Sequence, residues 1–90
     1  MKRISIDCAA IHDRAELHDA MKEALELPEW YGRNLDALHD CLTELTEETS
    51  LTLKNWQLMD DRLGPYAARF VFVCHRSSEE NPWFSVVMET

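Results

Sequence analysis

The sequence predicts an α/β fold, in which a three-stranded parallel β-sheet is packed with about four helices. Residues 2–7, 50–56 and 83–89 have the short alternating or apolar patterns of strands. Two helical patterns lie between each strand and the next, and such crossovers join parallel strands. Only two glycines and three prolines occur in 90 residues, which argues against a loop-rich chain. We expect the first strand at the centre of the sheet and the helices on one face or around an edge.

The first two helices are predicted from their N-terminal signals and the spacing of their leucines. Asp13 followed by Glu16 has the spacing of a capping box, so a helix is expected over 14–26. Asn34 is a favourable N-cap for a second helix over 35–45. Leucines recur in that helix at spacings of three and four, which places them on one face.

The second half of the chain predicts a strand, two helices and a last strand. The strand over 50–56 alternates, and a short helix over 57–64 follows. Pro65 suits the first turn of the next helix, which reaches the acidic residues near position 80. Its apolar centre also has strand propensity, but the length of the segment favours a helix. The strand over 83–89 is apolar enough to be largely buried.

Length and charge limit the possible functions. Ninety residues correspond to one small domain, expected over 1–90, and the hydrophobic fraction of 46% is enough for one core. Acidic residues outnumber basic ones by 17 to 9, so the net charge is −8. That sign disfavours direct binding to nucleic acid, which relies on lysine and arginine. It favours a basic partner protein, or simply solubility.

Three cysteines, Cys8, Cys41 and Cys74, are widely spaced and form no C-x-x-C pair. This pattern suits neither a disulfide framework nor a zinc site, and we expect three small buried side chains. The N-terminus has no long apolar run, and no stretch approaches the ~20 apolar residues of a membrane helix. The expected location is the reducing cytoplasm.

Two carboxylates, Asp36 and Asp40, lie one helical turn apart, opposite the leucines of the second helix. Thr43 shares their side, and His39 lies at the border of the two faces. Like charges at this spacing disfavour a helix by about 0.2–0.5 kcal/mol, so they call for an explanation. Solubility alone could be that explanation.

The segment over 26–43, with the sequence ELPEWYGRNLDALHDCLT, resembles the barstar family of intracellular inhibitors of barnase-type ribonucleases. The matching positions are Pro28, Trp30, Tyr31, Gly32, Asn34, Leu35, Asp36, Ala37, Leu38 and Asp40. The predicted order of elements also agrees with the three-stranded parallel sheet of that family. The resemblance implies an immunity-type inhibitor with a basic ribonuclease as partner, no cofactor, no metal, and a monomeric free state.

The resemblance also implies a contact surface made of the loop over 29–34 and the helix over 35–45. Its expected members are Trp30, Asn34, Asp36, His39, Asp40 and Thr43. Asp36 and Asp40 would face the basic groups of the ribonuclease, with Asp40 in the place of a substrate phosphate. Fixed carboxylates can take this place because an enzyme that binds RNA lines its groove with cationic side chains, which form charge-assisted bonds to carboxylates.

Two positions depart from the family pattern. His39 stands where the best-known member has an interfacial tryptophan, and Arg76 aligns with an acid of the family. We expect protonation of His39 to reduce the acidity of the face and to weaken binding as the pH falls. In the loop, Trp30 is expected to be partly exposed and Tyr31 mostly packed inside.

Other interpretations of the same residues remain open. Asp36 and Asp40 could form an ordinary solvated helix face, and with His39 they could in principle bind a metal ion, though three ligands from one helix make a weak site. No nucleophile and base are assembled by the sequence pattern, so we expect no enzyme. The chain could also bind a basic partner other than a barnase-type ribonuclease.

Overall fold

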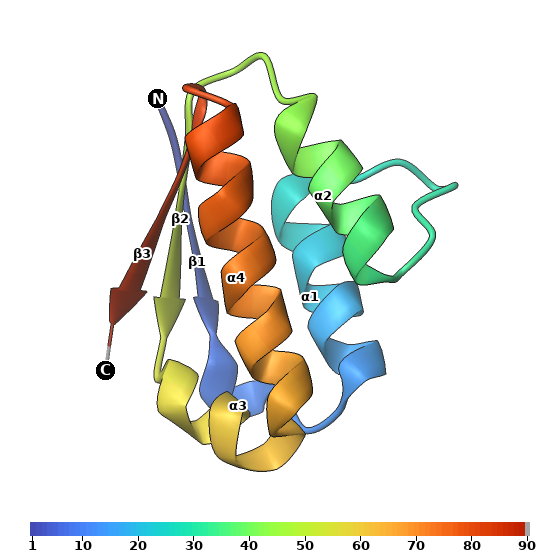
Figure 1. The fold of residues 1–90 in the computed structure, drawn as a ribbon, viewed down its shortest axis with the longest axis vertical. Helices are drawn as coiled ribbons and strands as arrows, with labels where there is room; N and C mark the ends of the chain where they lie inside the picture. Colours follow the sequence, from blue (N-terminus) through green and yellow to red (C-terminus); the bar gives the residue numbers. More distant parts are fainter. Residues whose placement is uncertain (90) are drawn as a thin grey trace.

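The computed structural model describes residues 1–89 and confirms the predicted α/β architecture with a three-stranded parallel sheet (Figure 1). The strands are β1 (Lys2–Asp7), β2 (Thr49–Lys54) and β3 (Phe84–Glu89). The helices are α1 (Arg14–Leu25), α2 (Leu35–Thr43), α3 (Trp56–Leu63) and α4 (Pro65–Glu80), with a short 3₁₀ helix, η1 (Cys8–Ala10), after β1. The 3₁₀ helix was not predicted from the sequence.

The strand order is β1-β2-β3, so the prediction that the first strand is central is wrong. The central strand β2 pairs with a neighbour on each side, and its Leu51 and Leu53 are fully buried. In β1, by contrast, Ile4 is only half-buried. Two α-helices lie between each strand and the next, and each new strand is added beside the previous one, so that the sheet grows in one direction.

The last strand is less buried than predicted. Phe84 is buried, but Val87 is exposed, and Val86 and Met88 are half-buried. The physical reason is that β3 is an edge strand and that α1, α2 and α4 lie together on one side of the sheet (Figure 1). Side chains that alternate away from the helices therefore remain in contact with solvent.

Several element boundaries differ from the predicted ones by one or two residues. Strand β2 ends at Lys54 instead of residue 56, because Asn55 adopts the left-handed conformation (φ 55°) and turns the chain into α3. Helix α1 ends at Leu25, where the left-handed Glu26 follows (φ 54°). Helix α2 ends at Thr43, two residues before the predicted end.

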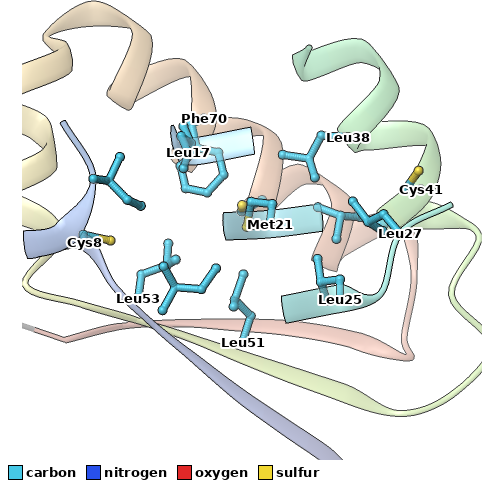
Figure 2. Packing of buried hydrophobic residues seen from close by; sticks show 14 of the residues in the cluster. Cys8, Leu17, Met21, Leu25, Leu27, Leu38, Cys41, Leu51, Leu53 and Phe70 are labelled. Atoms are coloured by element: carbon cyan, nitrogen blue, oxygen red, sulfur yellow. The ribbon is translucent and has the colours of Figure 1, made fainter. Parts of the chain in front are cut away.

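The core lies between the sheet and the helices, and side chains from distant parts of the chain meet in it. Fully buried members are Leu17 and Met21 of α1, Leu38 of α2, Phe70 of α4, and Leu51 and Leu53 of β2 (Figure 2). This packing fixes α2 from its leucine side. The opposite side of α2 therefore faces solvent, and the packing of its leucines holds the helix in place.

All three cysteines are buried free thiols, as predicted. Burial raises the pKa of Cys8 to about 11 and that of Cys74 to about 12, and it also raises the pKa of Cys41. Thiols with such values are poor nucleophiles at neutral pH. Within residues 1–89, no helix is long and apolar enough to cross a bilayer.

Candidate partner-binding face

The N-terminus of α2 is fixed by the predicted cap. The Asn34 side-chain oxygen accepts a hydrogen bond from the Ala37 backbone N–H at 2.8 Å, and its amide nitrogen donates to the Gly32 carbonyl at 3.2 Å. A Cβ atom on Gly32 would lie 3.2 Å from that nitrogen and 3.4 Å from the Ala37 Cβ. Glycine at position 32 thus leaves room for the capping side chain, and the helix begins at a defined place.

The two aspartates of interest, Asp36 and Asp40, are both exposed on α2. The Asp40 side chain keeps 78% of its accessible surface. On the opposite side of the helix, Leu38 and Leu42 are fully buried. The leucine pattern therefore orients the carboxylates outward, as predicted, and no other segment of residues 1–89 covers them.

Thr43 lies at the end of the same side of α2 and is half-buried. Its hydroxyl donates to the backbone carbonyls of His39 at 2.8 Å and Asp40 at 3.2 Å. The donor of this hydroxyl is thus engaged within the helix. Its oxygen can still accept a hydrogen bond from another group.

His39 joins α2 to the end of α4. Its Nε2 lies 2.7 Å from a Glu80 carboxylate oxygen, while its Nδ1 lies 4.0 Å from Asp40. The other Glu80 oxygen accepts from Arg76 Nε at 3.0 Å. These two hydrogen bonds, that from Arg76 first, lower the pKa of Glu80. The two departures from the family pattern are thus linked through one carboxylate.

The loop between α1 and α2 separates its two aromatic side chains as predicted. Trp30 is 75% exposed, more than expected, whereas Tyr31 is 4% exposed. The Tyr31 hydroxyl lies 2.6 Å from Nδ1 of His18, which is itself buried in α1. Packing of one aromatic ring therefore anchors the loop while the other ring projects into solvent.

A family model described as Barstar (barnase inhibitor) matches residues 1–89. The chain belongs to the barstar family. The protein of Bacillus subtilis (strain 168) named "Putative ribonuclease inhibitor YrdF" is 38% identical over 91 residues, which cover 99% of this chain and 100% of that protein. The resemblance inferred from the segment over 26–43 is thus confirmed over nearly the whole chain.

In this barstar-family chain, the fold brings the predicted contact residues to the loop and helix α2, on one side of the molecule. Trp30, Asn34, Asp36 and Asp40 are exposed, and His39 and Thr43 are half-buried. Within residues 1–89, no three His, Cys, Asp or Glu side chains converge as metal ligands would. The alternative of a metal site on Asp36, His39 and Asp40 has no geometric support there.

Sequence reasoning missed two residues that shape this face in the barstar-family chain. Glu80 contacts His39 although 41 positions separate them, and no local pattern indicates such a contact. Arg33 pairs with Asp19 of α1 at 2.7 Å and donates to the Ala15 carbonyl at 3.3 Å. Arg33 also has φ 54°, so the turn before α2 depends on this residue more than on Gly32.

Proposed function

We propose that this barstar-family chain binds a basic, barnase-type ribonuclease and blocks its active site. The observation that carries the proposal is the pair of exposed carboxylates, Asp36 and Asp40, on a helix that is capped at one end and packed through its leucines. Carboxylates held in this way need little reorganisation to meet arginine or lysine side chains. They would occupy the positions that RNA phosphates take in the enzyme.

The exposed Trp30 beside these acids suits the same role. A large exposed aromatic side chain that becomes buried on binding is typical of an interface hot spot. The Tyr31–His18 contact fixes the loop that carries it, so the tryptophan is presented at low entropic cost. The three buried thiols with raised pKa values agree with a binding role and not a catalytic one. The benefit to the cell would be protection from a ribonuclease of its own.

The test is the affinity of Asp40→Ala for barnase, measured by calorimetry and by inhibition of RNA cleavage. We expect the dissociation constant to rise by at least thirtyfold, because truncating one member of a buried charge pair costs about 2–5 kcal/mol. Asp61→Ala is the matched control, since Asp61 is an exposed acid of α3, away from the proposed face. Urea unfolding should be similar for both variants. Equal loss of affinity in the two variants would reject the assignment.

The alternative is a basic partner that is not a barnase-type ribonuclease. Arg76 supports this alternative, because it adds a positive charge beside the His39–Glu80 contact. Wild-type protein that leaves barnase fully active, but captures another basic protein through Asp40, would establish this alternative. A ribonuclease assay on the captured protein separates the two cases.

A further inference from the structure

An arginine-lined hollow lies beside the start of α2, between the loop, α1 and α4, and has a volume of about 650 Å³. Arg14, Arg33 and Arg69 all line it. The whole chain has only nine lysines and arginines and a net charge of −8. One third of the basic side chains of the chain therefore line one hollow. Basic side chains spread evenly over the surface would not be concentrated in this way.

Two of these arginines are held in place by other groups of the protein. Arg33 pairs with Asp19 at 2.7 Å and donates to the Ala15 carbonyl, which leaves further N–H donors of its guanidinium available. The Arg14 guanidinium lies 4.3 Å from the centroid of the Tyr66 ring. A cation stacked on an aromatic ring is oriented without being neutralised.

The positive charge in the hollow is only partly balanced. Neither Arg14 nor Arg69 has a carboxylate within ion-pair distance among residues 1–89, and Asp36 is the one acid of the described chain that lines the hollow. Burial raises the pKa of Tyr66, and the charges of Arg14 and Arg69 oppose this rise. Both guanidinium charges therefore act on the same phenol, which also lines the hollow.

The inner wall is formed by a fixed, uncharged pair of side chains. Nε2 of the buried His18 lies 2.6 Å from the Tyr66 hydroxyl. Burial, and secondarily the charge of Arg33, lower the pKa of His18, so the imidazole is neutral at pH 7. Tyr66 is thus held in one position, and the arginine stacked on it is positioned in turn.

We propose that this hollow binds the phosphate group of a small molecule through Arg14, Arg33 and Arg69. Guanidinium groups bind phosphate oxygens with paired, charge-assisted hydrogen bonds, and three of them from separate elements can surround one group. The first turn of α2 borders the same space, and its backbone dipole favours an anion there. The volume is in the range of small-molecule sites, about 300–1,000 Å³. This inference does not depend on the proposed ribonuclease partner.

The experiment is a titration of the full chain with inorganic phosphate and, separately, with adenosine monophosphate, followed by NMR and calorimetry at constant ionic strength with chloride as reference. We expect saturable binding of one equivalent, with the largest shifts at Arg14, at Arg69 and in the first turn of α2. Tighter binding of the nucleotide would assign a phosphorylated organic ligand, and equal affinities would assign phosphate alone. Absence of saturation with both probes would overturn the proposal.

Three variants sharpen this test. Arg69→Gln should weaken phosphate binding about tenfold, because it removes a charge-assisted bond. Arg3→Gln is the matched control, since Arg3 is exposed on β1 outside the hollow, and it should change the affinity less than twofold. Asp36→Asn should strengthen phosphate binding, because it removes the acid that lines the hollow. The proposed function predicts that Asp36→Asn weakens ribonuclease binding, so the two proposals can fail separately.

If Arg69→Gln and Arg3→Gln lowered the phosphate affinity equally, only the overall charge of the chain would matter, and the proposed site would be rejected.

Discussion

At the scale of single residues, the buried His18 joins three separate parts of the fold. Its two ring nitrogens each lie 2.6 Å from a tyrosine hydroxyl, Tyr31 in the loop and Tyr66 in α4. The neutral imidazole can donate from one nitrogen and accept at the other, so both hydroxyls are satisfied. One buried ring thereby connects α1 to two segments that lie 13 and 48 positions away. The sequence shows a histidine beside the leucines of α1, but it does not show these partners.

This arrangement predicts a loss of stability at low pH. Burial lowers the pKa of folded His18 below the ordinary value of 6.5, so the unfolded chain binds the proton more readily. The contribution is complete above pH 6.5 and is lost as the pH falls toward the folded pKa, by up to about 1.4 kcal/mol per pH unit. Urea unfolding of wild type and His18→Gln from pH 8 to pH 5 should show their difference in unfolding free energy shrinking. His75→Gln, at an exposed histidine of α4, is the control. A difference that stays constant with pH would contradict the prediction.

At the scale of helices and strands, the beginnings of α1 and α2 were predicted correctly and their ends were not. Both predicted N-caps are present, since the side chains of Asp13 and Asn34 each accept a backbone N–H at 2.8 Å, three residues on. This signal is local and can be seen in the sequence. The Glu16 carboxylate departs slightly from a capping box, because it accepts from the N–H of His12 instead of that of Asp13. The ends of α1 and α2 carry no glycine, and the predicted ends were one or two residues too late.

The end of α1 offers a test of this reasoning. Glu26 adopts φ 54° and ψ 46°, a conformation that costs a residue with a Cβ about 1–2 kcal/mol. Glycine has no such cost, so Glu26→Gly should raise the free energy of unfolding by about 1 kcal/mol, after its greater freedom in the unfolded chain is subtracted. The contact of Glu26 with Lys2 is exposed, and its loss should matter little. Urea unfolding measures the change.

Glu26→Gln is the control for that measurement. It removes the charge but keeps the Cβ, so its stability should stay within about 0.5 kcal/mol of wild type. If glycine and glutamine gave the same stability, strain at this helix end could not be the cause.

At the scale of the whole molecule, the sequence allowed the layers to be predicted but not the order within them. A pair of helices between strands requires a parallel sheet, but their lengths do not specify which strand is central. The apolar composition of β3 suggested that the strand is largely buried. Val87 is exposed because α1, α2 and α4 lie on one side of the sheet and leave the other side uncovered. The outward direction of Asp36 and Asp40 could be predicted because it follows from the leucine period alone, whereas the Glu80 contact depends on how α4 packs.

The net charge of −8 also acts at this scale, beyond any single contact. If the proposed function holds, the field of the acidic chain attracts a basic ribonuclease before contact, and dissolved salt screens that field with a Debye length of about 10 Å at 0.1 M. Stopped-flow mixing with barnase should show the association rate constant falling about tenfold or more between low and high salt, while the dissociation rate constant changes much less.

Two variants separate the field of the whole chain from single contacts. Asp61→Asn, remote from the proposed face, should lower the association rate constant slightly, and only at low salt. Asp40→Asn should instead speed dissociation at every salt concentration, since its pair would be shielded from solvent in the complex. A salt dependence confined to dissociation would mean that contacts alone, and not the field of the whole chain, govern the encounter.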